Sequence, residues 1–270
     1  MILRRGFMAN QYTTGNAAPK LDYMKDELIA MYQSGMSVRA ISKEIGEYQQ
    51  AIATTLDRYI ERKPKKTIKV NPNYFESIDS EDKAYFLGFI AADGALVDNG
   101  QGVMVLTISI KKDDRVILDK LKECLESEHN IQELPRNQVR LSLANKKLAS
   151  DLISHGIEQR KSLTMGKMLH HIPEEHRRHF IRGYFDGDGS VFTCTTGRPG
   201  SPRTTRYIAI RGTKEFLEEI QEYCGIKGHI QFNTGTHQLR CGAEADVTKF
   251  RDLIYTDSTF CLERKRERFY

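Results

Sequence analysis

The chain has 270 residues, of which 39% are hydrophobic and 29% charged, and a formal net charge of +5 at pH 7. These values are typical of a soluble globular protein with one large domain or two smaller ones. The longest apolar run, residues 86–92, is far shorter than the roughly 20 residues of a membrane helix, which argues against a membrane protein. The opening MILRRGFMANQ has no apolar core, which argues against a secretion signal.

The five cysteines form no CxxC pair, which favours reduced thiols in a cytosolic protein over a disulfide framework. The charge is placed unevenly along the chain. Residues 1–70 contain 12 Lys and Arg against 7 Asp and Glu, whereas the remaining residues contain 29 of each. The excess positive charge therefore favours the N-terminal part as the region that binds nucleic acid.

Three short helices are predicted within residues 20–61, each with an apolar stripe at helical spacing. Ser37 is suited to cap the second helix, and Gly46 to form a sharp turn before the third. The stripes consist of Leu28, Met31 and Tyr32, then Val38, Ile41 and Ile45, and then Ile52, Leu56 and Ile60.

This arrangement resembles a helix-turn-helix DNA-binding module. Glu47 stands where such turns usually carry an apolar residue, so a plain three-helix bundle remains an alternative. If the resemblance holds, the outward side chains of the third helix that would contact base edges and phosphates are Gln49, Gln50, Thr54 and Arg58.

Residues 62–73 combine basic residues with two prolines and have no clean helical or strand period, which predicts a linker. Its positive charge suits a solvated tether or a segment that lies along a phosphate backbone. In the second case, Lys65 and Lys66 would contact DNA.

After residue 73 the chain repeats one unit. Asp93 matches Asp188 at an offset of 95, and Ile108 matches Ile208 at an offset of 100, which places Lys111 and Arg211 at matching strand ends. Each copy reads helix, two strands, helix, two strands, helix. The predicted fold class is therefore α+β, with repeats at residues 74–166 and 167–270.

The repeated motif is FLGFIAADG (86–94) and IRGYFDGDG (181–189). In each copy, two small residues lie four positions apart and therefore on one helical face. Because glycine inside a helix costs about 1 kcal/mol against alanine, close packing of the two helices is the expected reason. The small residues at this predicted interface are Gly88 and Ala92, and Gly183 and Gly187.

Asp93 and Asp188 are predicted to end these helices, where carbonyl groups carry partial negative charge. Two such ends side by side would give the all-oxygen environment that a hard divalent cation such as Mg²⁺ prefers. Simple capping of a buried helix pair remains an alternative. A calcium loop fails because Val191 and Gly197 stand where glycine and glutamate are required. The spacing of His170, His171, His176 and His179 matches no common zinc pattern.

The two motifs resemble those of single-chain LAGLIDADG homing endonucleases, and the resemblance covers roughly residues 74–270. It implies two pseudo-symmetric αββαββα halves whose sheets form a DNA-binding saddle. It also implies that Asp93 and Asp188 bind Mg²⁺, with Mn²⁺ as the alternative ion, assisted by the backbone oxygens of Ala92 and Gly187. Position six of the motif is Ala91 in one copy and Asp186 in the other, and this difference does not argue against activity.

The predicted strands alternate apolar residues with polar or basic ones, so each sheet should turn an apolar face to helices and a polar face outward. A merely solvated outer face is the alternative to a DNA-binding one. The outward residues suited to contact DNA are Ser109, Gln138, Arg140, Arg203, Tyr207, Gln231, Gln238 and Arg240.

The resemblance also implies catalytic roles for basic residues. Lys161 and Lys265, in matched RK pairs, resemble the paired active-site lysines of the family, although Lys265 also fits a generic basic tail. They would activate the nucleophilic water or neutralise charge on the scissile phosphate. Lys111 and Arg211 stand where the family has a polar residue that orders water.

The predicted function is sequence-specific, metal-dependent double-strand DNA cleavage across the minor groove with staggered ends. A cleavage-inactive DNA-binding regulator and an intron RNA maturase on the same scaffold are the alternatives. The expected partner is double-stranded DNA, with intron RNA only in the maturase alternative. We expect a monomer in the cytoplasm, either associated with the nucleoid or in a phage-infected host.

Overall fold

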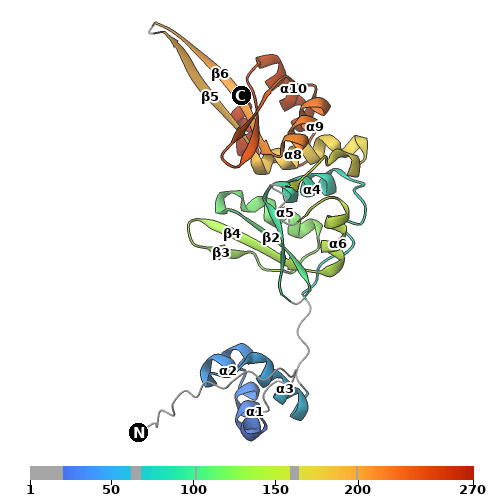
Figure 1. Cartoon of the computed structure of the whole chain (residues 1–270), viewed down its shortest axis with the longest axis vertical. Helices are drawn as coiled ribbons and strands as arrows, with labels where there is room; N and C mark the ends of the chain where they lie inside the picture. Colours follow the sequence, from blue (N-terminus) through green and yellow to red (C-terminus); the bar gives the residue numbers. More distant parts are fainter. Residues whose placement is uncertain (1–20, 62–67, 101, 159–163, 199) are drawn as a thin grey trace. The chain divides into compact units, whose positions relative to one another are not determined.

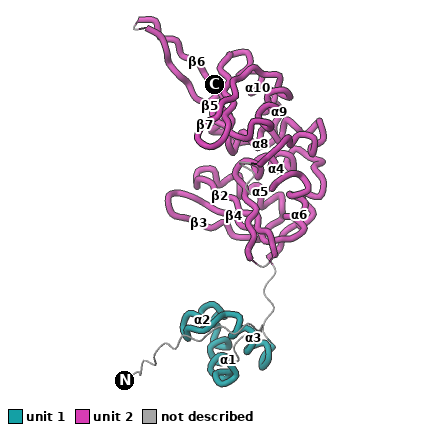
Figure 2. The backbone as a smooth tube through the Cα atoms, viewed as in Figure 1, with its two compact units in different colours: residues 1–67 teal, residues 68–270 magenta. Residues whose placement is uncertain are grey.

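The computed structural model describes residues 21–61, 68–100, 102–158, 164–198 and 200–270. The chain divides into two compact units at the boundary between Thr67 and Ile68, and each unit has its own hydrophobic core (Figure 2). Three predicted site residues, Lys65, Lys66 and Lys161, lie outside the described residues. Within the described ranges, no helix is long and apolar enough to cross a membrane.

The first unit is a bundle of three short helices. Ser37 Oγ accepts a hydrogen bond from the Ala40 N–H at 3.2 Å, and Gly46 ends the second helix in the left-handed region at φ +77°. The predicted cap and the predicted turn are therefore both present. The helices, which follow the 3₁₀ turn η1 (Asp22–Met24), are α1 (Lys25–Gln33), α2 (Val38–Ile45) and α3 (Gln49–Tyr59).

The second unit contains the same series of elements twice. The first copy consists of α4 (Glu81–Asp93), β1 (Gly94–Asp98), β2 (Met104–Lys111), α5 (Arg115–Cys124), β3 (Gln132–Leu134), β4 (Gln138–Ala144) and α6 (Lys146–Ser154). The second consists of α8 (Arg177–Asp188), β5 (Gly189–Arg198), β6 (Ser201–Gly212), α9 (Lys214–Cys224), β7 (His229–Asn233), β8 (Thr236–Cys241) and α10 (Glu244–Tyr255).

Short elements complete the second unit. These are the helix α11 (Glu263–Arg266) and the 3₁₀ turns η2 (Lys112–Asp114), η3 (Leu169–His171), η4 (Glu174–His176) and η5 (Glu267–Phe269).

Each copy forms one antiparallel four-stranded sheet, in the order β1-β2-β4-β3 and β5-β6-β8-β7. The two orders are equivalent, so the predicted α+β fold of two pseudo-symmetric halves is confirmed. Figure 1 shows the strands of both copies on one side of the second unit and the helices α6, α9 and α10 on the other. We call the side of the sheets away from these helices the open face.

The strand register corrects one predicted match between the copies. Gly94 pairs with Ile108, whereas Gly189, its equivalent, pairs with Ile210. Ile108 therefore corresponds to Ile210 and not to Ile208. The prediction that Lys111 and Arg211 occupy matching strand ends was wrong, because the counterpart of Arg211 is Ser109. The sequence pattern allowed this error, since a slip of two residues keeps every side chain on the same face.

The helices α4 and α8 pack directly against each other, backbone to backbone. A side chain at Gly88 would overlap the carbonyl oxygen of Phe180, and one at Gly183 would overlap that of Tyr85. A side chain at Gly187 would overlap the methyl group of Ala92. The small residues of both motifs thus lie at the helix interface, and larger ones would push the two helices apart.

Candidate functional site

The two motif helices end at their aspartates. Gly94 and Gly189 follow with extended φ values of −77° and −83°, which any residue can adopt. Glycine is needed here for space. A Cβ atom would lie 2.7 Å from the Ile90 carbonyl oxygen at position 94, and 2.5 Å from that of Phe185 at position 189. The chain therefore turns from helix into strand against the last helical turn.

The structure brings the two aspartates to the same place. A Cβ atom at Gly187 would lie 3.2 Å from Asp93 Oδ2, so the Asp93 carboxylate rests against the last turn of α8, next to Asp188. Asp93 is half-buried and Asp188 is exposed. Burial, followed by the charges of Asp188 and Asp93, raises the pKa of Tyr184 well above its ordinary value. Both carboxylates are thus near the same buried ring.

Lys265 lies at this junction as well. Its ammonium group donates hydrogen bonds to the carbonyl oxygens of Phe185 at 2.9 Å and of Gly187 at 2.7 Å. Burial lowers the pKa of Lys265 to about 8, although the negative charges of Asp186, Asp93 and Asp188 act in the opposite direction. A cationic side chain is therefore fixed at the end of α8, close to both predicted acids.

Asp186 has a role that the sequence analysis missed. Its buried carboxylate accepts hydrogen bonds from Tyr85 Oη at 2.9 Å, Tyr255 Oη at 2.7 Å and the Leu262 N–H at 2.7 Å. Desolvation raises its pKa, and these three bonds act against that shift. Because Leu262 begins the segment that carries Lys265, Asp186 ties this segment to the helix pair. The available signal was an acid within an otherwise apolar stretch of the motif.

A second carboxylate holds the same segment. Glu81, in the first turn of α4, accepts from Arg182 Nη2 at 2.6 Å and from the Thr259 N–H at 2.8 Å. Arg182 is fully buried in α8 and also donates to the Ile254 carbonyl at 3.2 Å. Two acids, one from each motif helix, thus position the backbone that leads to Lys265.

The donor set at the helix ends fits a hard divalent cation. It offers the carboxylates of Asp93 and Asp188 and the carbonyl oxygens of Ala92 and Gly187, all of them oxygen. The Gly187 oxygen already accepts from Lys265, but a carbonyl oxygen has two lone pairs. The described residues contain no group of three or more His, Cys, Asp or Glu placed to hold a metal, so backbone oxygen and water would complete the coordination.

The histidines between His170 and His179 contact other side chains of the second unit. His179 is buried against Arg182, and burial followed by the Arg182 charge lowers the pKa of its imidazole to about 4. The rings of His170 and His171 contact each other with centroids 3.9 Å apart and planes tilted by 39°.

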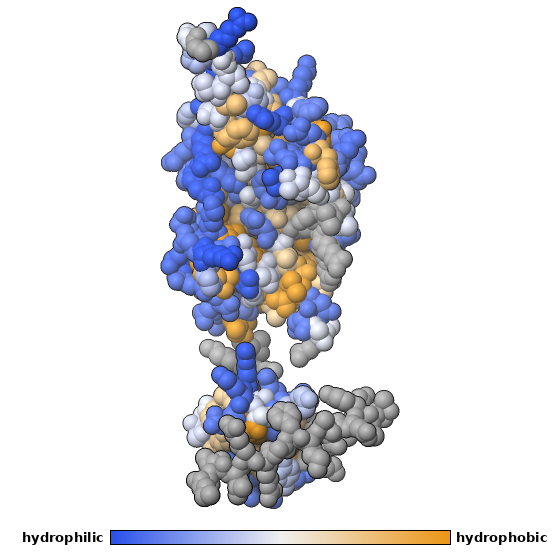
Figure 3. All heavy atoms as spheres, turned by 60° about the vertical axis from the view of Figure 1, so that its left-hand side comes forward, coloured by the Kyte–Doolittle hydropathy of each residue, from blue (hydrophilic) through white to orange (hydrophobic). Residues whose placement is uncertain are grey.

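The open face carries most of the predicted DNA-binding residues. Arg140 Nε donates to Ser109 Oγ at 2.8 Å, and this pair corresponds by register to Gln238 and Arg211 in the second copy. Gln231 continues the second row. Figure 3, which turns this side of the second unit toward the viewer, shows mostly hydrophilic surface with small apolar patches.

The remaining candidates in the second unit are spread along the strands. Lys111 is exposed at the end of β2. Arg211 is exposed, and its carbonyl oxygen accepts from Tyr184 Oη at 2.8 Å. Arg203 is exposed on the projecting part of β6. Of these three residues, only Arg211 is bonded to Tyr184, the buried ring near Asp93 and Asp188 at the helix ends.

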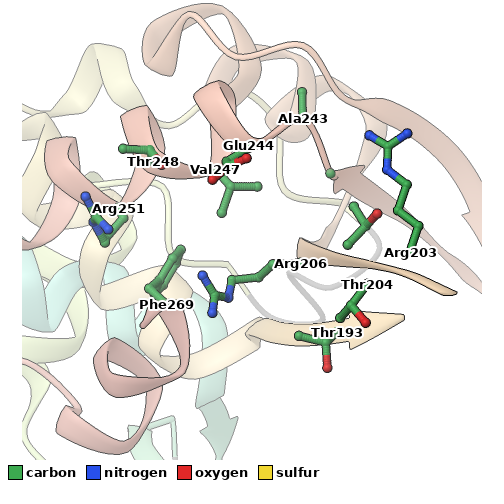
Figure 4. A pocket seen from close by; sticks show the side chains of 12 residues that line it. Thr193, Arg203, Thr204, Arg206, Ala243, Glu244, Val247, Thr248, Arg251 and Phe269 are labelled. Carbon is green, nitrogen blue, oxygen red and sulfur yellow. The ribbon is translucent and has the colours of Figure 1, made fainter. Parts of the chain in front are cut away.

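A pocket of about 430 Å³ lies between the β5–β6 hairpin and the start of α10 (Figure 4). Arg206 and Arg251 line it, and Figure 4 shows both near Phe269, apart from Arg203. Arg206 donates to the carbonyl oxygen of Tyr270. Asp93, Asp188 and Lys265 are not among the residues that line this pocket. The pocket is therefore separate from the candidate metal site.

Residues 175–255 match the family model described as a LAGLIDADG-like domain. The second unit has the LAGLIDADG homing-endonuclease fold. The LAGLIDADG meganuclease I-AabMI bound to uncleaved DNA superposes with a TM-score of 0.53 at 11% identity, covering 68% of this chain and 86% of that chain. No curated protein matches this chain. We refer to residues 68–270 as the LAGLIDADG unit.

Two further solved structures share the fold. The I-LtrWI LAGLIDADG homing endonuclease bound to target DNA gives a TM-score of 0.52 at 11% identity, covering 73% of this chain and 88% of that chain. I-SmaMI bound to cleaved DNA gives 0.51 at 13% identity, covering 74% and 87%. The resemblance inferred from the two motifs is thereby confirmed for the fold of the LAGLIDADG unit.

The predicted DNA-binding residues of the first unit differ in exposure and in the contacts that they already make. Gln49 and Gln50 are exposed at the start of α3, and Thr54 is half-buried. Arg58 forms an ion pair with Asp22 at 2.5 Å, with both side chains partly exposed. Only Nη1 of Arg58 donates to Asp22, so its Nε and Nη2 groups can contact a phosphate while the ion pair persists.

Proposed function

We propose that this protein is a site-specific DNA endonuclease that cuts both strands of its target with the help of a divalent cation. One observation carries the proposal: the Asp93 carboxylate lies against the last turn of α8, which ends at Asp188, and the buried ammonium group of Lys265 is bound to the Gly187 carbonyl in that same turn. The two pseudo-symmetric copies would each serve one DNA strand. The DNA-bound nucleases that share the fold support this reading.

Asp93 and Asp188, with the carbonyl oxygens of Ala92 and Gly187, would hold Mg²⁺ or Mn²⁺. When bound, such an ion lowers the pKa of a water molecule and stabilises negative charge on the phosphate. Lys265 would add positive charge next to the scissile phosphate, because the carbonyls of Phe185 and Gly187 fix its ammonium group there. Lys161 would be its counterpart in the first copy.

The open face would lie in the major groove on both sides of the cut, and the helix ends would face the minor groove between them. Polar side chains suited to base edges occupy the equivalent rows Ser109–Arg140 and Arg211–Gln238. The first unit would act as a helix-turn-helix module that adds affinity through its tether, the basic segment that precedes the second unit at Ile68. The protein would work as a monomer, since one chain supplies both acids.

The central test is cleavage of a randomised duplex pool by the full chain with Mg²⁺, followed by sequencing of the ends. Asp93→Asn and Asp188→Asn should bind the selected target as the wild type does and lose double-strand cleavage by more than about 100-fold, because each removes a negative charge that holds the ion. Asp119→Asn, a surface change on α5, is the matched control. EDTA should abolish cleavage, and Mg²⁺ or Mn²⁺ should restore it.

Each outcome of this test has a distinct meaning. Undiminished double-strand cutting by Asp188→Asn would remove that residue from the mechanism. Specific binding without any cleavage by the wild type would identify a DNA-binding regulator. Binding to a folded intron RNA in preference to every duplex would identify a maturase.

A further inference from the structure

One arginine on the open face of the second copy packs against two neighbouring aromatic rings. The guanidinium carbon of Arg240 lies 4.0 Å from the ring centroid of Tyr207 and 5.0 Å from that of Phe192. The two rings stack on each other, with centroids 5.7 Å apart and planes 19° apart. Stacking uses the flat side of the guanidinium and turns its N–H edge toward other partners.

The Nε atom of Arg240 is buried, and among the described residues it has no hydrogen-bond partner. The position directly across from Arg240 on β6 is Ala209, whose small side chain adds no polar partner there. On β7 the position across from Arg240 is His229, which is exposed and does not bond to Arg240 Nε. The rings therefore determine the orientation of this arginine.

Gly242 makes room for this arrangement. A Cβ atom at position 242 would overlap the Tyr207 ring, reaching 2.9 Å from its Cζ atom and closer to two others. The absence of a side chain thus lets the ring lie over the backbone next to Arg240. We call Tyr207, Phe192 and Gly242 the Arg240 cradle.

The first copy has no such cradle. By the strand register, Val105 and Val97 take the places of Tyr207 and Phe192. Ser142 takes the place of Arg240, and Ala144 that of Gly242. All four positions differ in size and chemistry, although the backbone of the two sheets is equivalent. The cradle is therefore a feature of one copy only.

We propose that Arg240 recognises a single guanine in the major groove of the half-site bound by the second copy, and that the first copy reads no guanine at the equivalent position. This rests on the proposed function. A guanidinium fork can donate to both O6 and N7 of guanine, and no other base edge in the major groove offers that acceptor pair. A pre-oriented fork loses little side-chain entropy on binding, which favours specific readout over a loose phosphate contact.

The test compares base preferences of full-length variants. Wild-type protein is incubated with a randomised duplex pool, and both the bound and the cleaved fractions are sequenced. Arg240→Gln and Arg240→Lys should each lose the preference for guanine at one position by roughly 5- to 150-fold, with the other positions unchanged. The lysine variant keeps the charge, so its loss separates fork geometry from electrostatics.

Two variants test the Arg240 cradle while Arg240 itself is left unchanged. Gly242→Ala should displace the Tyr207 ring and weaken the same guanine preference. Tyr207→Val, which installs the residue of the first copy, should do so too and covers the case in which Gly242→Ala fails to fold. Arg140→Gln is the matched control, since it should alter preference only in the opposite half-site.

Two kinds of failure are distinguishable. A wild-type protein that enriches no duplex sequence in either fraction would overturn the proposed function, and this inference with it. An enriched target whose profile is unchanged in Arg240→Gln would overturn the inference alone. So would a uniform loss of affinity across all sequences, because that result would assign Arg240 to a phosphate.

Discussion

The two copies within the LAGLIDADG unit are alike where the backbones of α4 and α8 touch. They differ on the open face and at the buried motif position occupied by Ala91 and Asp186. Gly88 and Gly183 make equivalent contacts, with the carbonyls of Phe180 and Tyr85 respectively. In contrast, the open face carries Val105 and Ser142 in one copy and Tyr207 and Arg240 in the other. Backbone contact across a pseudo-two-fold axis leaves room only for small residues such as Gly187 and Ala92, whereas an outward face can diverge without cost to the fold.

The largest expected effect tests the symmetric part of this comparison. Gly88→Val and Gly183→Val should each destabilise the LAGLIDADG unit by about 3 kcal/mol or more, because the new side chain meets a helix backbone that cannot move aside. Urea unfolding followed by circular dichroism would measure both. Gly166→Ala is the control, since its new Cβ would meet only Glu215 Oε2 at an ordinary 3.7 Å. Clearly unequal losses would show that the helix pair is less symmetric than described.

A smaller effect tests the asymmetric core. Ala91 and Asp186 occupy the same motif position, each 2% exposed. Asp186→Ala should cost about 2 kcal/mol, because it leaves two tyrosine hydroxyls and the Leu262 N–H without their acceptor. Ala91→Asp should cost a similar amount by burying a carboxylate that has no prepared donors. Thermal unfolding at neutral pH would measure both, and a neutral Ala91→Asp would indicate a hidden donor set in the first copy.

The smallest effect concerns how the two motif helices begin. Ser80 Oγ caps α4 through the Lys83 N–H at 3.4 Å, whereas α8 follows the turn η4 and has no side-chain cap at His176. Ser80→Ala should therefore cost about 0.5–1 kcal/mol, and His176→Ala should cost less. Urea unfolding curves of both variants and the wild type would rank the two losses in the free energy of unfolding. An equal loss at both positions would mean that the cap contributes nothing to the difference.

Periodicity and composition predicted much of the fold for physical reasons. Alternation placed Val139, Leu141 and Leu143 toward the core because successive strand residues point to opposite faces. Small residues four apart predicted the helix contact, since only close approach justifies glycine inside a helix. The same logic could not fix the match between β2 and β6, because a shift of two residues leaves the alternation intact.

Other features depended on contacts between segments far apart in sequence. Nothing local to Asp186 indicates that Tyr85, Tyr255 and Leu262 supply its donors. Lys265 looked like part of a basic tail until its ammonium group proved to be held by two carbonyls of α8. Gly242 had no motif around it, and only the position of the Tyr207 ring explains it.

The sequence by itself thus determined the duplication, the ends of the motif helices at Asp93 and Asp188, and the face that each strand residue occupies. These follow from local periodicity and from steric rules that act within a few residues. Only the tertiary structure decided the register between the copies, the burial of Asp186 and Lys265, and the cradle around Arg240. Those depend on distances between distant segments, which a one-dimensional pattern does not contain.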